Sequence, residues 1–237
     1  MRLDKFLCDM GLGTRTQVKQ QIRKGLVTVD GVTVLRPEQK VETDQKICVE
    51  EKELSYVEKE YYMLNKPAGC ISASSDKNCT TVLDLIKEKK RSDLFPVGRL
   101  DKDTEGLLLI TNDGNLAHCL LSPRKHVDKT YFARVKGRIT KEHVQAFAKG
   151  VDIGEAKPSL PAVLKIEKDG EESEVFVTIR EGKYHQIKRM FAAVGCQVLF
   201  LKRLSMGSLK LDPRLNPGEY RPLTEEELRL LQEETKC

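Results

Sequence analysis

A carboxylate stands beside an apolar strand in the segment of residues 98–114. Asp101 follows Gly98-Arg99-Leu100 and precedes residues 107–110, which we expect to form a buried strand. The packing of such a strand can hold a neighbouring side chain in place, as an acid or a nucleophile requires. The same aspartate could instead be a loop residue that bonds its own backbone. Asp103 could join it as a metal ligand, but no His or Cys lies at a supporting spacing.

Two later segments place polar side chains on elements that the sequence predicts clearly. Tyr131 enters an expected strand, where a tyrosine commonly packs on a face of the sheet. In residues 184–194, apolar residues recur at helical spacing and form one face. Lys188 and Arg189 fall outside that face. The simplest interpretation of these two is a solvated basic rim on a helix.

The first 58 residues are predicted to form two small helices and a hairpin. Apolar residues recur at helical spacing within residues 3–10, and Thr14 with Gln17 forms a capping box for a second helix. Alternating β-branched residues around Asp30-Gly31 indicate a hairpin over residues 27–34. The exposed side of the second helix should be basic, because four residues lie off its apolar side: Arg15, Lys19, Arg23 and Lys24.

Residues 59–237 are predicted to form a second, larger domain of the α+β class. Strands are expected over residues 61–64, 107–110, 130–135, 161–166 and 174–179, and helices over residues 81–86, 140–149 and 184–194. Helices interspersed irregularly among runs of strands favour a mixed, mainly antiparallel sheet. Thr224 and Glu227 form a capping box for a last helix.

The composition indicates a globular protein that binds a polyanion. The net charge of +5 is concentrated in basic segments, such as residues 183–214, which hold seven Lys and Arg against one Asp. Such segments suggest a surface that faces nucleic acid, although solvated surface charge is the plainer alternative. Seven cysteines without a Cys-x-x-Cys spacing argue against a disulfide framework and a zinc site. No run of about 18 apolar residues is present, so we expect a reduced, cytoplasmic protein without a membrane span.

The first domain resembles the S4 RNA-binding domain. Residues 2–7, Arg-Leu-Asp-Lys-Phe-Leu, and the Val-Thr-Val-Asp-Gly hairpin at residues 27–31 carry this similarity, which covers about residues 1–58. A helical cap on the next domain, with incidental charges, is the alternative. The resemblance implies that the basic helix contacts RNA phosphates through Arg15, Lys19, Arg23 and Lys24. Such contacts position a protein on RNA without reading its sequence.

The second domain resembles the RNA pseudouridine synthases. The pattern Gly-Arg-Leu-Asp-x-x-Thr-x-Gly-Leu-Leu-Leu from Gly98 matches the family's signature, although Glu105 departs from the small hydroxyl residue often found there. Lys129-Thr130-Tyr131 matches a second motif, and Gly-x-Tyr-His-Gln-Ile-Lys-Arg-Met from residue 182 matches a third. The Pro-Gly-Glu-Tyr-Arg-Pro ending at residues 217–222 is similar to the ribosomal small subunit group of this family.

The resemblance assigns a role to each motif. Asp101 becomes the catalytic carboxylate, Tyr131 lies against the target base and removes the C5 proton, and Lys188 pairs with Asp101. Lysine replaces the arginine common in the wider superfamily, so a point charge replaces a bidentate pair. Arg99 is expected to hold the flipped nucleotide or its backbone. Arg189 is expected to contact RNA, and His185 is assigned a structural or RNA-contacting role.

The expected activity is therefore isomerisation of one uridine of 16S rRNA, of the uridine-516 type, in free RNA or a pre-ribosomal particle. We expect a monomer that needs no cofactor, nucleotide cofactor or metal. Two rival hypotheses remain open. A relative within the same family that acts on 23S rRNA shares all three motifs, and a noncatalytic S4-type ribosome-assembly factor would not need Asp101, Tyr131 and Lys188 together.

Overall fold

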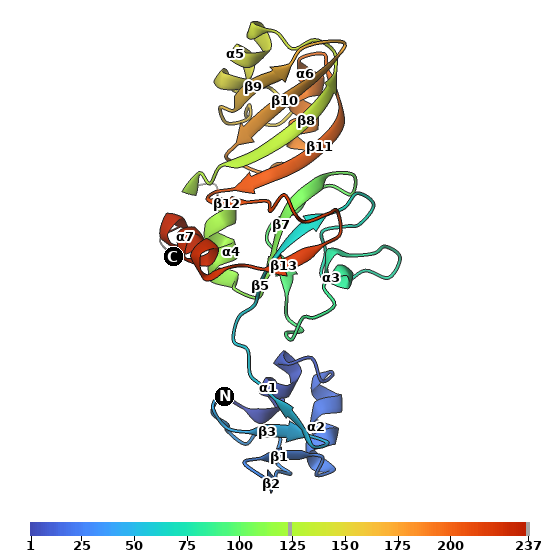
Figure 1. The fold of residues 1–237 in the computed structure, drawn as a ribbon, viewed down its shortest axis with the longest axis vertical. Helices are drawn as coiled ribbons and strands as arrows, with labels where there is room; N and C mark the ends of the chain where they lie inside the picture. The colour runs from blue at the N-terminus through green and yellow to red at the C-terminus, as the bar shows by residue number, and fades with distance from the viewer. Residues whose placement is uncertain (123–124, 236–237) are drawn as a thin grey trace. The chain divides into compact units, whose positions relative to one another are not determined.

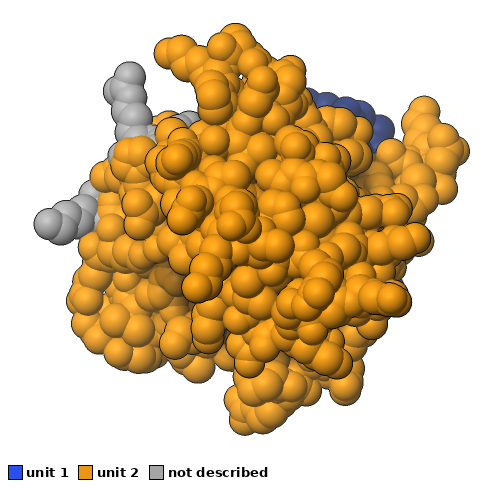
Figure 2. All heavy atoms as spheres, turned by 90° about the horizontal axis from the view of Figure 1, so that it is seen from above, with its two compact units in different colours: residues 1–60, 87–94 blue, residues 61–86, 95–237 orange. Residues whose placement is uncertain are grey.

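The computed structural model describes residues 1–122 and 125–235, which fall into two compact units (Figures 1 and 2). The first unit comprises Met1–Glu60 and Lys87–Leu94, and the second comprises Tyr61–Ile86 and Phe95–Cys237. The sequence predicts a single boundary between residues 58 and 59. The chain of the structure instead returns once to the first unit before it completes the second.

The first unit joins two helices to a small sheet. Thr14 and Gln17 form the predicted capping box at the start of α2. Asp30 and Gly31 have φ angles of 50° and 80°, as a tight two-residue hairpin turn requires. The sheet has the order β2-β1-β3-β4, and only its first hairpin was predicted. The elements are α1 (Leu3–Asp9), α2 (Arg15–Arg23), β1 (Val27–Val29), β2 (Val32–Thr33), β3 (Ile47–Val49) and β4 (Lys52–Leu54).

The returning segment is held in the first unit by a buried arginine. Arg91 is 4% exposed, pairs with Asp93 at 2.6 Å and with Asp9 at 3.4 Å, and donates a hydrogen bond to the carbonyl of Val57. The carboxylate of Glu60 accepts from the backbone N–H of Arg91 at 2.8 Å. These polar contacts explain why a segment distant in sequence belongs to this unit.

The second unit is built on a nine-stranded sheet with the order β13-β5-β7-β11-β8-β10-β9, while β6 and β12 pair with β7 and β11. Among the strands that the structure describes in this sheet, every strand pairing is antiparallel except that of β7 with β11. The predicted α+β class with a mainly antiparallel sheet is confirmed. The strands are β5 (Tyr61–Lys66), β6 (Phe95–Pro96), β7 (Glu105–Thr111), β8 (Lys129–Lys136), β9 (Val163–Lys168), β10 (Glu172–Ile179), β11 (Gln197–Met206), β12 (Leu209–Lys210) and β13 (Tyr220–Pro222).

The helices of this unit complete its core. Met63 and Leu107 of the sheet share one buried cluster with Leu116 of α4 and Leu231 of α7, and burial of such side chains contributes roughly 2 kcal/mol each. Thr224 and Glu227 form the predicted capping box before α7. The helices are α3 (Val82–Leu85), α4 (Gly114–Leu121), α5 (Lys141–Lys149), α6 (Gln186–Ala193) and α7 (Glu225–Thr235).

Two features of the composition have structural counterparts. Within the described residues, no helix combines the length and the apolar character that a membrane crossing demands. Five cysteines of the described residues are free thiols: Cys8, Cys48, Cys70, Cys79 and Cys196.

Candidate active site

The loop that carries Asp101 lies between β6 and β7 and is held by its backbone. The N–H of Thr104 donates to the carbonyl of Asp101 at 3.1 Å, which closes the loop on itself. The hydroxyl of Ser72 donates to the carbonyl of Leu100 at 2.9 Å and accepts from the N–H of Leu100 at 3.0 Å. These bonds fix the main chain on both sides of Asp101, so the carboxylate extends from a defined position.

A buried lysine supports the same loop. Lys66, at the end of β5, is fully buried, and its ammonium donates to the carbonyls of Thr104 at 2.9 Å, Asp101 at 3.0 Å, Pro67 at 3.1 Å and Lys102 at 3.3 Å. Burial lowers the pKa of Lys66, an effect that the nearby carboxylates partly oppose. No role was predicted for Lys66, although a lysine at the end of an apolar strand is a usable signal.

Tyr131 reaches the site from the centre of the sheet. It lies on β8 opposite Arg203 of β11, and Arg203 is also aligned with Gly106 of β7. A Cβ at position 106 would lie 2.2 Å from the carbonyl oxygen of Arg203, so only glycine permits β7 and β11 to approach this closely. This approach brings the strand that follows the Asp101 loop near the strand that carries Tyr131.

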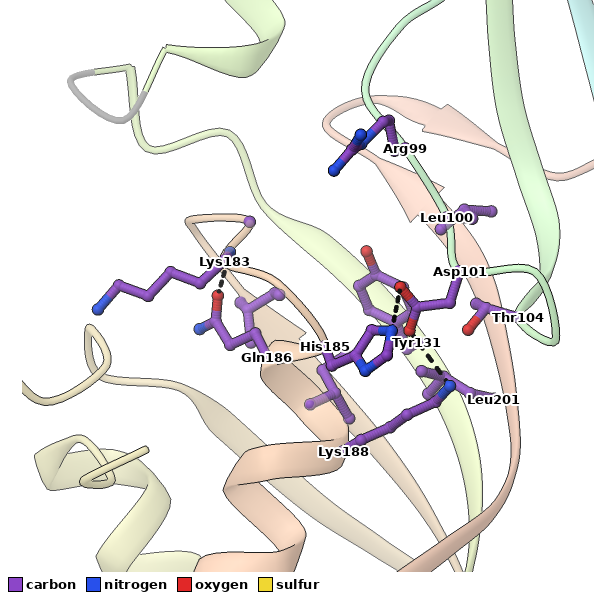
Figure 3. Close-up of a pocket in the computed structure, with 13 residues that line it drawn as sticks. Arg99, Leu100, Asp101, Thr104, Tyr131, Lys183, His185, Gln186, Lys188 and Leu201 are labelled. Atoms are coloured by element: carbon purple, nitrogen blue, oxygen red, sulfur yellow. Dashed lines mark hydrogen bonds and ion pairs between the residues drawn. The ribbon is translucent and has the colours of Figure 1, made fainter. Parts of the chain in front are cut away.

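The start of α6 supplies the remaining polar groups. His185 precedes the helix in a left-handed conformation with φ of 48°, and its Nε2 lies 3.5 Å from Asp101 Oδ1. One turn into the helix, Lys188 Nζ lies 3.2 Å from Asp101 Oδ2 and 2.6 Å from Asp103 Oδ1. Figure 3 shows the histidine and the lysine approaching the two oxygens of Asp101. A strained backbone at His185 therefore coincides with a direct contact to the candidate carboxylate.

The electrostatics of this cluster favour a charged lysine. Burial lowers the pKa of Lys188, but hydrogen bonds to Asp103 and Asp101 outweigh burial and leave this pKa above its usual value. The hydrogen bond from Lys188 also lowers the pKa of Asp103, against the opposing effect of burial. The ammonium is thus shared between two carboxylates, and the part of Asp103 was not predicted.

The structure brings four of the predicted site residues together. Asp101, Tyr131, Lys188 and Arg99 line one hollow on the second unit (Figure 3). Tyr131 is 7% exposed, and Asp101 is half-buried. Three segments that are distant in sequence therefore contribute to one hollow: the loop with Arg99 and Asp101, the strand with Tyr131, and the helix with Lys188.

Other predicted residues lie elsewhere. Arg189 pairs with Glu155 at 2.8 Å and donates to the carbonyl of Ile153, and it does not line the hollow. The four predicted RNA-binding residues of α2 belong to the first unit. Among them Lys19 is half-buried, and three are exposed: Arg15, Arg23 and Lys24.

The hollow has no evident metal-binding set. Within residues 1–122 and 125–235, no three His, Cys, Asp or Glu side chains are grouped so that they could hold a metal ion. The hollow instead combines a carboxylate, a buried tyrosine and an ammonium, which suits acid–base or nucleophilic chemistry on a substrate held beside the aromatic ring.

Comparison with known proteins identifies the family. Residues 60–193 match the RNA pseudouridylate synthase family, and residues 1–47 match the S4 domain. An uncharacterised RNA pseudouridine synthase of Bacillus subtilis is 49% identical, with 98% of this chain and 99% of that protein covered. The ribosomal small subunit pseudouridine synthases A of Vibrio cholerae and Escherichia coli are 42% and 41% identical, each over 96% of this chain and 98% of the relative.

A solved structure gives the same result for the fold. A crystal structure described as a pseudouridylate synthase superimposes with a TM-score of 0.69 at 38% identity, and the match covers 98% of this chain and 99% of that one. The chain therefore belongs to the RNA pseudouridine synthase family and carries an S4 domain ahead of its synthase domain.

Proposed function

We propose that this RNA pseudouridine synthase isomerises one uridine of 16S rRNA, of the uridine-516 type, with Asp101 as its catalytic carboxylate. The observation that carries the catalytic assignment is the convergence of Asp101, Tyr131 and Lys188 on one hollow. The choice of 16S rRNA is supported by the similarity, over 96% of the chain, to enzymes named for the small ribosomal subunit.

The reaction fits the groups that line the hollow. Pseudouridine forms when the bond between N1 of uracil and C1′ of ribose breaks, the base turns, and C5 joins C1′. A proton leaves C5 and N1 ends protonated, so the isomerisation is balanced without a redox cofactor. The target base must leave its stack to reach Asp101, as in other enzymes that act on a single base.

Each polar residue has a proposed task in this sequence. Asp101 acts on the uracil ring or on the sugar, Tyr131 stacks on the base and removes the C5 proton, and Lys188 holds the carboxylate by its charge. Arg99, exposed at the rim, holds the flipped nucleotide or its backbone. The basic side of α2 binds RNA phosphates, which add affinity without specificity.

The proposed enzyme is a cytoplasmic monomer that acts on rRNA or on a pre-ribosomal particle. All groups assigned to the chemistry come from one chain, so a second copy is not needed to complete the hollow.

A map of pseudouridine in 16S and 23S rRNA tests the assignment. In a strain that lacks the protein, one site in 16S rRNA should lose its pseudouridine, and the wild-type protein should restore it. Asp101→Asn should not restore it, because the shape of the side chain is kept while the anion is removed. Asp169→Asn is the matched control, since Asp169 pairs with Arg138 outside the hollow and should restore the site fully.

Other results of the map would support one of the two rival hypotheses. Loss of a 23S rRNA site would replace the 16S assignment with the 23S one, and no loss in either rRNA would favour a noncatalytic role. In vitro, activity of Asp101→Asn within about tenfold of wild type, a difference of roughly 1.4 kcal/mol, would refute the essential role of Asp101.

A further inference from the structure

A second hollow adjoins the candidate active site and has basic residues in its wall. Its volume is about 370 Å³, and Asp101, Tyr131 and Arg99 line both hollows. Lys129 and Arg203 line the second hollow only, and neither has a role in the chemistry proposed above. The second hollow thus lies next to the proposed position of the reacting nucleotide. Its wall contains two cations that the proposed reaction does not use.

The sheet places these two cations beside the tyrosine. Lys129 and Tyr131 are two positions apart on β8, so their side chains leave the same face of the sheet. Arg203 of β11 is paired with Tyr131 in the register of the sheet and shares that face. The three side chains are therefore fixed by strand geometry rather than by a mobile loop.

Both cations are buried, and protein groups do not complete their polar contacts. Lys129 is 6% exposed and donates to the carbonyl of Val127 at 3.1 Å, while Arg203 is 2% exposed and donates through Nε to the carbonyl of Leu107 at 2.8 Å. One terminal nitrogen of Arg203 finds no acceptor within the part of the chain that the structure describes. A buried donor without a partner is costly, and such groups in native proteins usually meet a ligand or water.

Within the described residues, neither cation forms an ion pair with a carboxylate. Among described residues, no carboxylate lies within 4.0 Å of the charged nitrogens of Lys129 or Arg203. Asp128, the neighbour of Lys129 in sequence, forms an ion pair with Arg180 at 2.7 Å. Burial, with a further contribution from Arg203, lowers the pKa of Lys129 to about 8, although the charge of Asp128 partly opposes this shift. Two buried cations in one wall, neither of them in an ion pair, favour an anionic ligand.

We propose that Lys129 and Arg203 form a subsite for one backbone phosphate of RNA next to the target uridine. The subsite rests on the proposed position of that uridine beside Asp101. A flipped nucleotide stays attached to phosphates on both sides, and one of these must lie close to the ring of Tyr131. Lysine and arginine bind phosphate through charge-assisted hydrogen bonds, and the free donor of Arg203 would gain an acceptor. The phosphate would also neutralise the buried charge.

A substitution in the protein and a neutral linkage in the RNA test the subsite together. Lys129→Met keeps the length of the side chain and removes its charge. Synthetic RNA carries a single methylphosphonate, which is uncharged, on the 5′ or the 3′ side of the target uridine. Lys129→Met should weaken binding of natural RNA about tenfold, and the neutral linkage at one of the two positions should weaken wild-type binding by a similar factor.

The combination of the two changes decides the result. If Lys129 binds that phosphate, the neutral linkage should weaken RNA binding by the Lys129→Met variant by less than about twofold. The two changes would then be coupled by about 1 kcal/mol. If the factors by which the substitution and the neutral linkage weaken binding multiply at both linkage positions, the subsite is overturned. Lys136→Met is the matched control, because Lys136 is exposed, belongs to the same strand and does not line the hollow. It should show no coupling at either position.

A titration with mononucleotides separates this proposal from the assignment to 16S rRNA. Wild-type protein should bind uridine 5′-monophosphate or uridine 3′-monophosphate at least about tenfold more tightly than uridine, and Lys129→Met should remove that preference. Equal binding of the three compounds by the wild type would overturn the subsite, whichever rRNA is modified. Should the methionine variant fail to fold by circular dichroism, Lys129→Gln replaces it and retains a donor for Val127.

Discussion

The ammonium of Lys188 lies 3.2 Å from one carboxylate oxygen of Asp101, and this contact joins the third sequence motif to the first. Lys188 also lies 2.6 Å from Asp103, so one cation serves two carboxylates of the same loop. An ion pair that is fully exposed to solvent contributes little to stability. The side chains of Lys188 and Asp101 are each only 25% exposed, so the effect of their pairing on the site should be larger than that of a surface pair.

We expect Lys188→Arg to keep activity within about tenfold of wild type and Lys188→Ala to lose at least about 100-fold, near 2.7 kcal/mol. Arginine still supplies a cation, whereas alanine leaves a half-buried carboxylate without one. Single-turnover rates at saturating RNA measure the effect. Asp103→Asn is the control, since it removes only the second partner of Lys188 and should retain most activity. Equal losses for arginine and alanine would contradict the pairing role.

The motif residues could be predicted because their signals are local in sequence. Asp101, Tyr131 and Lys188 each lie in a short segment with a recognisable pattern, and the structure needed only to bring the segments together. Lys66 and Arg203 could not be assigned in this way. Their roles depend on backbone carbonyls and strands that are distant in sequence, and a buried charged residue in an apolar strand interrupts the pattern that predicts the strand.

The elements that were missed have similar explanations. No helix was predicted after the strand over residues 107–110, but Asp113 caps α4 there. Residues such as aspartate favour turns as well as helix starts, so the sequence does not separate the two. The ten-residue strand β11 contains Lys202 and Arg203 at its centre, which hides its buried positions. The β3–β4 hairpin turns at Glu50 and Glu51, which have φ angles of 48° and 68° without the usual glycine or asparagine.

Replacement of Lys66 by methionine should damage both stability and catalysis. The ammonium donates to four backbone carbonyls, three of them in the Asp101 loop, and methionine offers no donor. We expect the free energy of unfolding to fall by roughly 1–3 kcal/mol in urea titrations. The single-turnover rate should fall more than tenfold while RNA affinity changes little, because the position of Asp101 is disturbed. A variant with wild-type rate would show that the loop holds Asp101 without this lysine.

The basic side of α2 should supply affinity rather than chemistry. Arg15→Ala with Lys19→Ala removes two cations from the first unit, while the proposed catalytic residues belong to the second. Each lost phosphate contact lowers the dependence of log K on log salt by about 0.7 for single-stranded RNA, so the slope should flatten by roughly one unit or slightly more. Single-turnover rates at saturating RNA should be unchanged.

A matched double variant checks this division of roles. Arg36→Ala with Lys40→Ala removes two exposed cations of the same unit that lie outside α2, and it should leave the salt slope as in wild type. If the α2 variant keeps its affinity and salt slope yet slows the saturated reaction, the first unit takes part in catalysis and the division is wrong.

Replacement of Lys129 should stabilise the protein, whereas replacement of Lys66 should destabilise it. The charge of Lys129 is buried with a single carbonyl partner. Its pKa is lowered from 10.5 to about 8, first by burial and then by Arg203. Below pH 8 the lysine is charged in the folded and unfolded states, and the full cost of burial is present. Between pH 8 and pH 10.5 the unfolded state binds more protons, so stability rises with pH.

Lys129→Met removes this cost, so the variant should be more stable than wild type by about 1–3 kcal/mol at pH 7. The difference should shrink as the pH approaches 10, where the lysine of the wild type loses its charge in the folded state. Urea titrations of both proteins from pH 6 to pH 10 measure the trend, and Lys136→Met, on an exposed position, should show no such difference. A gain in stability together with weaker binding of RNA is the trade expected when a charge is kept for a ligand rather than for the fold. A methionine variant that is less stable at pH 7, or whose difference from wild type does not change with pH, would mean that protein groups already compensate the charge of Lys129.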